Sequence, residues 1–262
     1  MHKTQLEILP VQLLNSYCGD ISKPVRQSFE ALTDCELSAG TFSFFTSVAV
    51  VFSSRVERES IEFDSLIKHK MLGVRFLPSY IHKIDDLYEA YRFAEQSPLN
   101  AETIKEAHTL LTKHILQKAN RGKLRTGDRL AITAYGKIEY AACAPTRIKI
   151  ELNKLYNDIE LLLKTDLSFN ETLFFAALIH LVFIKIQPFD DGNGLTARLI
   201  EKWFMAQKLG PKAWFVQSER YYHSQLDTYY ANIRRLGSEY DALAYDEAMP
   251  FLKMTAEGLI YW

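Results

Sequence analysis

A continuous apolar run from Leu173 to Ile186 constrains the fold of this chain more than any other stretch. The run belongs to a helix that we expect over about 170–186, and its side chains are apolar on nearly every face. A helix without a polar face must be covered on all sides, so it belongs in the centre of a helical bundle. The most apolar short window, Phe42 to Phe52, is about eleven residues long and too short to span a bilayer. We therefore expect no membrane segment.

The composition agrees with a well-packed helical protein. The 262 residues suffice for one large domain or two modest ones, and a chain of this length buries about three quarters of its unfolded surface. Hydrophobic residues make up 48% of the chain, whereas Gly and Pro number only 11 and 8. With 31 basic and 32 acidic side chains the formal charge is −1. This balance gives no general attraction for nucleic acid or for an anionic membrane.

The cysteines and the N-terminus indicate the compartment. Cys18, Cys35 and Cys143 are widely spaced and odd in number, a pattern that fits neither a disulfide framework nor a zinc site. A reduced cytosolic compartment is the simplest inference. The first residues, Met1 to Glu7, lack the apolar core of a signal peptide. We expect a cytoplasmic protein.

The apolar run leads into Pro188, two carboxylates and the sequence Gly192-Asn193-Gly194, and a second helix is expected over about 196–207. Glycines allow positive φ and a close approach of the backbone, and N–H groups in the first turn of a helix bind phosphate-like anions. Asp191 could ligate Mg²⁺, which prefers oxygen ligands and substrate phosphates. Arg198 lies about one helical turn beyond Gly194 and can reach the same anion. A solvent-exposed loop between two helices is the alternative, and a P-loop is excluded because no Gly-Lys-Ser/Thr follows.

As a whole the stretch resembles the signature of the Fic (Fido) family, written His-Pro-Phe-x-(Asp/Glu)-Gly-Asn-Gly-Arg-x-x-Arg. The matching positions are Pro188, Phe189, Asp191, Gly192, Asn193, Gly194 and Arg198. Two positions differ, since Gln187 stands in place of the family's His and Leu195 in place of its first Arg. The resemblance implies a mainly α-helical, Fic/Fido-like bundle with a small β-hairpin flap.

In the family this signature binds Mg–ATP and transfers AMP to a Ser, Thr or Tyr hydroxyl of a target protein. The resemblance implies that Asp191 ligates Mg²⁺, that the residues from Gly192 to Gly194 hold the α- and β-phosphates, and that Arg198 binds the terminal phosphate. Position 187 would hold the general base, but the carboxamide of Gln187 has no basic nitrogen near neutral pH. Losing a general base slows a reaction about 10²–10⁴-fold. Losing the guanidinium at Leu195 removes about 3 kcal/mol of transition-state stabilisation.

Upstream, Ser53-x-x-x-Glu57 resembles the inhibitory motif of Fic proteins, Ser/Thr-x-x-x-Glu-(Gly/Asn). We expect a helix over about 42–57 on the basis of its length and of this motif, because the β-branched residues would also allow a strand. In the relatives this helix lies against the active site, and its Glu pairs with the second Arg of the signature, here Arg198. Arg58 differs from the usual Gly or Asn. A surface Glu in a charged cluster is the alternative.

Residues 131–140 predict a short β-hairpin with Gly136 at its turn. The hairpin lies where Fic proteins carry a flap, after a Gly-x-x-Arg segment that the stretch from Gly122 to Arg125 resembles. In the family the flap positions the hydroxyl of an extended segment of the target protein by strand addition. The expected flap residues are Ile132, Thr133, Ala134 and Tyr135. A surface hairpin without a partner is the alternative.

Helical periodicity predicts the rest of the chain. Further helices are expected over 23–37, 80–96, 100–115, 145–164, 218–235 and 241–259, and a connection over 63–79. His108 and His180 lie on apolar helix faces and are expected to be structural. The expected organisation is an N-terminal helical region with the inhibitory helix over 1–95, a Fic-like core over 96–240, and a C-terminal helix packed on the core over 241–262.

Three interpretations of the function follow. The chain is a Fic-fold pseudoenzyme that binds a nucleotide without transferring it, an active transferase that uses another base, or a helical interaction module with a relic loop. The retained Asp191, glycines and Arg198 argue against the third, whereas Gln187 and Leu195 argue against the second. We favour the first, with Mg–ATP as the expected ligand.

Overall fold

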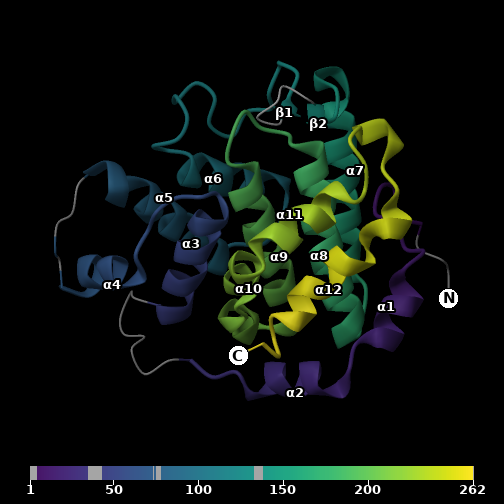
Figure 1. Cartoon of the computed structure of the whole chain (residues 1–262), viewed down its shortest axis with the longest axis horizontal. Helices are drawn as coiled ribbons and strands as arrows, with labels where there is room; N and C mark the ends of the chain where they lie inside the picture. Colours follow the sequence, from purple (N-terminus) through teal and green to yellow (C-terminus); the bar gives the residue numbers. More distant parts are fainter. Residues whose placement is uncertain (1–4, 35–42, 73, 75–77, 133–137, 262) are drawn as a thin grey trace.

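The computed structural model describes residues 5–34, 43–72, 74, 78–132 and 138–261. The described chain is mainly α-helical, as predicted, with one small pair of strands at the edge of the bundle (Figure 1). The α-helices are α1 (Leu14–Asp20), α2 (Lys23–Ala31), α3 (Phe44–Val56), α4 (Phe63–Leu72), α5 (Pro78–Glu95), α6 (Ala101–Leu111), α7 (Pro145–Lys164), α8 (Phe169–Ile186), α9 (Asn193–Leu209), α10 (Ser218–Ser224), α11 (Leu226–Arg234) and α12 (Met249–Glu257). Three 3₁₀ segments are η1 (Pro211–Phe215), η2 (Tyr240–Ala242) and η3 (Tyr245–Ala248).

Helix α8 is the centre of the bundle. It begins with a capping box, in which Ser168 Oγ accepts from the Glu171 N–H and the Glu171 carboxylate accepts from the Ser168 N–H. Its most extensive packing is against α9, and α1, α7 and α12 also pack against it (Figure 1). Its length and mean hydropathy of 1.6 would allow it to cross a membrane, but 78% of that stretch is buried inside the fold. Helix α8 is therefore longer than the apolar stretch over 42–52 that was considered from the sequence, and it is buried as a core helix is.

The short strands form the predicted hairpin. Strand β1 (Leu130–Ile132) pairs antiparallel with β2 (Ile138–Ala141), with Leu130 opposite Ala141 and an irregularity between Ala131 and Ile132. The pairing confirms a hairpin in this region. Three of the expected flap residues, Thr133, Ala134 and Tyr135, lie outside the described residues.

Several predicted boundaries in the N-terminal half are wrong. Helix α2 ends at Ala31 and not at residue 37, because Leu32 adopts an extended backbone and the following Thr and Asp are weak helix formers. The predicted connection over 63–79 contains α4 and the start of α5. Pro78 begins a helix, where its missing N–H has no intrahelical partner to lose. Helix α6 ends at Leu111, not near 115.

Two predicted boundaries in the C-terminal half are also wrong. The single helix expected over 218–235 is two helices, α10 and α11, separated at Gln225, whose backbone is not helical (φ −115, ψ 38). The single helix expected over 241–259 is not present. The 3₁₀ segments η2 and η3 take up the first part of this stretch, and the α-helix α12 begins only at Met249, with Pro250 in its first turn.

Candidate functional site

The signature loop is held by its own side chains. Asn193 Oδ1 accepts from the Phe189 N–H at 3.0 Å, and Asn193 Nδ2 donates to the Phe189 carbonyl at 2.8 Å. Phe189 is 1% exposed. The sequence predicted a Gly-Asn-Gly loop between two helices, but the second helix already begins at Asn193. The Gly192-Asn193-Gly194 sequence is therefore the N-terminal turn of α9 itself, with Gly192 as its N-cap.

His108 connects this loop to two other parts of the chain. Its ring stacks on Phe189 with 3.7 Å between the centroids. Nδ1 lies 3.0 Å from the Gly122 nitrogen, which can only donate, and Nε2 lies 2.9 Å from the Asp191 carbonyl, which can only accept. These partners fix a neutral imidazole with its hydrogen on Nε2. Burial lowers the pKa of His108 to about 4. The prediction of a structural histidine is confirmed.

The first turn of α9 presents backbone donors to a cavity. The first intrahelical bond runs from Thr196 N to Gly192 O at 2.9 Å, so the N–H groups of Asn193, Gly194 and Leu195 precede the helical ladder. Gly192 has φ +75, and a Cβ there would lie 2.7 Å from Thr112 Cγ2, so both conformation and space require glycine. A Cβ on Gly194 would overlap Glu57 Oε1. The carboxylate of Glu57 therefore occupies the space directly in front of the turn.

Arg198 is fastened to the end of α3. Its Nη2 donates to Glu57 Oε1 at 2.6 Å and to the Ser53 carbonyl at 3.0 Å, and its Nε donates to Ser53 Oγ at 2.8 Å. Arg198 is 1% exposed, whereas Glu57 is 39% exposed. Burial alone would lower the pKa of Arg198, but the charge and hydrogen bond of Glu57, together with Tyr229 and Tyr230, raise it above its usual value. The resemblance of Ser53-x-x-x-Glu57 to the inhibitory motif implied this contact, and the structure contains it.

The position of Glu57 depends on how α3 ends. The Arg58 N–H donates to the Arg55 carbonyl at 2.9 Å and the Glu59 N–H to the Ser54 carbonyl at 3.1 Å. These two bonds form a Schellman motif, whose C′ residue adopts the left-handed conformation. That residue is Arg58, with φ +63. Gly and Asn, the usual residues at this position of the family motif, tolerate this left-handed backbone. Arg58 adopts the same conformation although its side chain disfavours it.

A chain of buried hydrogen bonds extends from Arg198 into the core. Arg198 Nη1 donates to the Tyr229 hydroxyl at 3.3 Å, and Tyr229 lies 3.0 Å from His180 Nε2. His180 Nδ1 lies 2.5 Å from Glu201 Oε2, and the hydroxyl of Tyr222 donates to the same carboxylate. His180 is fully buried and does not line the cavity. It is a structural histidine, as predicted, and not a base for the site.

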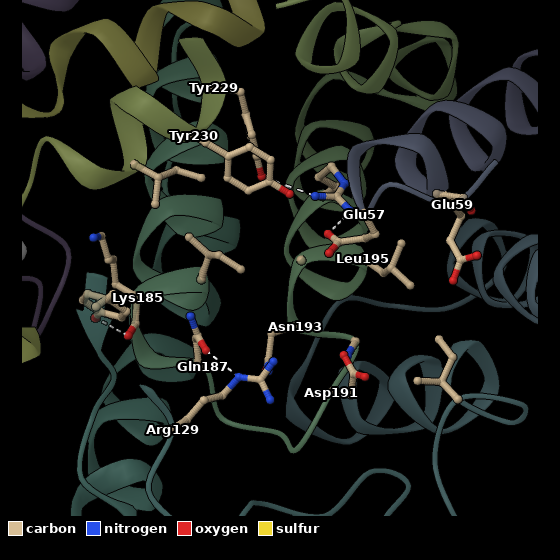
Figure 2. A pocket seen from close by; sticks show the side chains of 18 of the residues that line it. Glu57, Glu59, Arg129, Lys185, Gln187, Asp191, Asn193, Leu195, Tyr229 and Tyr230 are labelled. Carbon is tan, nitrogen blue, oxygen red and sulfur yellow. Dashed lines mark hydrogen bonds and ion pairs between the residues drawn. The ribbon is translucent and has the colours of Figure 1, made fainter. Parts of the chain in front are cut away.

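Gln187 lies at the end of α8 with a left-handed backbone (φ 45, ψ 65). Its side-chain Oε1 accepts from Arg129 Nε at 2.7 Å, and its carbonyl accepts from Arg125 Nε at 2.7 Å. Because a guanidinium can only donate, the oxygen end of the Gln187 carboxamide faces Arg129. Figure 2 shows its nitrogen end directed into the cavity. The position of the family's base therefore presents an N–H donor.

The segment before the hairpin is anchored on the same loop. Arg125 is 4% exposed, and its guanidinium donates to the carbonyls of Gln187, Gly127, Cys143 and Ile186. The Arg125 N–H donates to the Pro188 carbonyl at 3.0 Å. The Gly-x-x-Arg resemblance singled out this segment, and the structure places it against the signature loop.

These groups surround one cavity of about 400 Å³ (Figure 2). Its walls come from the ends of α3 and α8, the start of α9, α11 and the hairpin. Asp191, the candidate metal ligand, lies at its edge, and Asp191 Oδ1 accepts from the Gly192 N–H at 2.7 Å. Leu195 lines the cavity and is 7% exposed. Tyr230 lines it too and donates its hydroxyl to the Val56 carbonyl at 2.8 Å.

Arg129 and Lys185 are among the lining residues that were not singled out from the sequence. Arg129 lies between the Gly-x-x-Arg segment and the expected hairpin and matches neither motif. Lys185 is the one basic residue in the apolar run, and its charge among apolar neighbours was the available signal. It is 1% exposed, and its Nζ lies 4.2 Å from the centre of the Tyr140 ring and 3.3 Å from the Gly237 carbonyl. Burial lowers the pKa of Lys185 to about 8.

Comparison with known proteins supports the resemblance. Residues 98–205 match the sequence model of the Fic/DOC family, whereas no curated protein sequence matches the chain significantly. Among solved structures, a Fic family protein from Desulfovibrio desulfuricans G20 has a TM-score of 0.67 at 17% identity, over 95% of this chain and 70% of that one. A Fic domain containing signaling protein from Bacteroides thetaiotaomicron has a TM-score of 0.68 at 18% identity, over 91% and 92%.

A third similar structure is Fic-1 from C. elegans, with a TM-score of 0.67 at 16% identity over 94% of this chain and 71% of that one. At these identities the structures show a shared fold. The family match covers the turn, the loop and the arginine around which the cavity is built. Residues 98–205 of this chain therefore resemble the Fic/DOC family in sequence, and the chain shares its fold with solved structures of Fic proteins.

Proposed function

We propose that this protein binds the phosphate groups of a magnesium nucleotide, with ATP as the expected ligand, and that Glu57 keeps the site closed. Transfer of a nucleotidyl group to a protein hydroxyl is impaired, because Gln187 and Leu195 replace two groups that would drive it. The proposal follows the family's chemistry only as far as this chain retains the residues for it.

The observation that carries the proposal is the place of the Glu57 carboxylate. It lies in front of Gly194, where the N–H groups of the α9 turn and Arg198 converge. A helix N-terminus and a guanidinium both favour an anion, and here the chain itself supplies one. A phosphate oxygen has the same needs as this carboxylate oxygen, so Glu57 and a phosphate compete for one place.

The residues present fit a magnesium ion held together with its nucleotide. Asp191 offers a carboxylate at the edge of the cavity, and among the described residues no group of three or more His, Cys, Asp or Glu forms a complete metal site. Mg²⁺ is commonly held by one or two carboxylates plus phosphates and water. When bound, the ion would neutralise charge on the phosphates. Asp191 would hold it, and Oδ1 of this residue would keep its bond to Gly192.

Proton transfer is the weak point of the site. A hydroxyl that attacks a phosphoryl group must lose its proton, and Gln187 presents an amide N–H there instead of a basic nitrogen. Without a base we expect a rate about 10²–10⁴-fold below that of a site with one.

The hairpin supports a protein as the partner. Residue Ala141 of β2 already bonds outside the hairpin, since its N–H donates to the Ser238 carbonyl at 2.7 Å. The outer edge of β1 is then the edge to which an extended target segment would add.

Calorimetric titration with Mg–ATP tests the binding proposal. A ligand that binds only the open site has its affinity reduced by the fraction of molecules that are open, so Glu57→Gly should bind at least about tenfold more tightly than wild type. Glu62→Gly is the matched control, because Glu62 is an exposed, non-helical Glu in the same region that does not line the cavity. Absence of binding by both wild type and Glu57→Gly would overturn the proposal.

Incubation with labelled ATP tests the impairment. Glu57→Gly should transfer little or no label to itself. The triple variant Glu57→Gly, Gln187→His, Leu195→Arg restores the two groups that the signature has lost, so it should label itself. Rapid labelling by Glu57→Gly alone would show that another group serves as the base.

A further inference from the structure

The cavity has an uneven set of positive charges. Arg198 is held by Ser53 and Glu57, and Lys83 is paired with Glu59 at 2.7 Å. Leu195 contributes an apolar side chain where the family signature has a guanidinium. Within the described part of the chain, Arg129 lines the cavity without an ion pair to any carboxylate. No carboxylate of the described residues therefore neutralises the charge of the Arg129 guanidinium at this site.

Arg129 is held in place from both ends. Its carbonyl accepts from the Ala142 N–H at 3.0 Å, which fixes its backbone at the base of the hairpin. Its Nε donates to Gln187 Oε1 at 2.7 Å and its Nη1 donates to the Asp190 carbonyl. No hydrogen bond within the described residues uses Nη2. Figure 2 shows the guanidinium between Gln187 and Asp191, on the cavity side of the signature loop.

Gln187 and Arg129 form a matched pair. The bond to Arg129 directs the oxygen of the Gln187 carboxamide toward the guanidinium, so the NH₂ group of Gln187 points away from Arg129 and into the cavity. The NH₂ group of Gln187, at the end of α8, and the guanidinium of Arg129, beside β1, therefore both offer N–H donors to the cavity. Donors of this kind bind phosphate oxygens, and a guanidinium does so with two parallel bonds.

We propose that Arg129 supplies, from the base of the hairpin, the phosphate-binding guanidinium that Leu195 lacks, and that Gln187 orients it and adds a second donor. This inference rests on the proposed function, since it needs a phosphate-bearing ligand in the cavity. According to this inference, the positive charge that the family signature carries at position 195 is supplied here by Arg129, beside β1. The two departures from the signature then belong together, because Gln187 accepts from the guanidinium that replaces the one missing at position 195.

The test measures affinity in the Glu57→Gly background, for Mg–ATP and for adenosine, which has no phosphate. Arg129→Gln should weaken Mg–ATP binding about tenfold to a hundredfold, the effect of losing hydrogen bonds from a charged group, and should leave adenosine binding unchanged. Adding Leu195→Arg should recover most of the lost Mg–ATP affinity. Arg26→Gln is the matched control, because Arg26 lies exposed on α2, and its ion pair within the described residues is with Glu30.

The outcomes separate the two proposals. If Glu57→Gly binds no Mg–ATP, the proposed function fails and this inference fails with it. If Glu57→Gly binds Mg–ATP and Arg129→Gln binds it equally well, only the inference is overturned. Equal weakening of Mg–ATP and adenosine binding would also overturn it, since Arg129 would then be shaping the cavity. If Arg129→Gln does not fold, Arg129→Lys keeps the charge without the planar fork and should weaken Mg–ATP binding specifically.

Discussion

His108 should make the stability of this protein sensitive to mild acid. Its pKa is about 4 in the folded protein, against 6.5 for an unperturbed histidine. Between these values the unfolded chain binds more protons than the folded protein, so the free energy of unfolding rises with pH from about 4 to 6.5. Its stabilising contribution is therefore present above pH 6.5 and is lost as the pH falls through this window.

The magnitude follows from the two pKa values. Linkage gives a loss of about 2 kcal/mol from this residue between pH 7 and pH 5. The structural reason is the fixed tautomer, because a proton on Nδ1 would face the Gly122 N–H and break the bond that joins this loop to the signature. Acid should therefore loosen the site before it unfolds the rest of the bundle.

Urea denaturation at pH 7 and pH 5, followed by far-UV circular dichroism, measures this loss. His108→Gln has no titrating ring, so the difference in unfolding free energy between wild type and variant should shrink by about 2 kcal/mol at the lower pH. An equal difference at both pH values would refute the reasoning. NMR titration of the wild type gives a second measurement, in which the His108 ring signals should not shift between pH 7 and pH 5.

Three further predictions concern single side chains. Arg58→Gly should raise the free energy of unfolding by up to about 1 kcal/mol in urea denaturation, because glycine removes the left-handed strain at φ +63; a decrease would mean that contacts of the arginine side chain outweigh it. Asn193→Ala should lower the free energy of unfolding by about 2–4 kcal/mol in the same assay, since both polar groups of buried Phe189 lose their partners, and a smaller loss would mean that other groups replace them. Lys185 has a folded pKa of about 8, so the unfolded chain holds more protons between pH 8 and 10.5 and wild type should gain up to about 1.4 kcal/mol per pH unit over Lys185→Met. Parallel stability curves for these two proteins would contradict the burial of a charged Lys185.

The sequence predicted the helices whose ends carry explicit signals. Pro145 begins α7 as expected for a first-turn proline, and Asn100 caps α6 through its side chain. The boundaries that failed depend on tertiary packing. Leu66 of α4 is buried because the bundle covers it, and nothing in the stretch 63–79 alone reveals that cover. The break at Gln225 likewise has no glycine or proline to announce it.

The candidate site was predictable where a motif carried it. Glu57 and Arg198 are 141 positions apart, and only the resemblance to two family motifs joined them before the structure did. The hydrogen bonds by which the Asn193 side chain holds Phe189 were not predicted, since the resemblance pointed only to the part of Asn193 in the phosphate-binding turn. The sequence could not identify Arg129 as a lining residue of the site. No local pattern marks it, and its contact with Gln187, through Nε and Oε1, appears only in the folded structure.

The packing of α3 also has a consequence for the order in which the protein assembles. Helix α3 packs most extensively against α10, which is synthesised about 170 residues later, or roughly 10–30 s later at ordinary rates of translation. Contacts between parts so distant in sequence form late in folding. We therefore expect substitutions in the buried face of α3 to speed unfolding and to leave the refolding rate nearly unchanged. The end of α3, where Glu57 lies, would then close over the cavity as the last part of the candidate site to form.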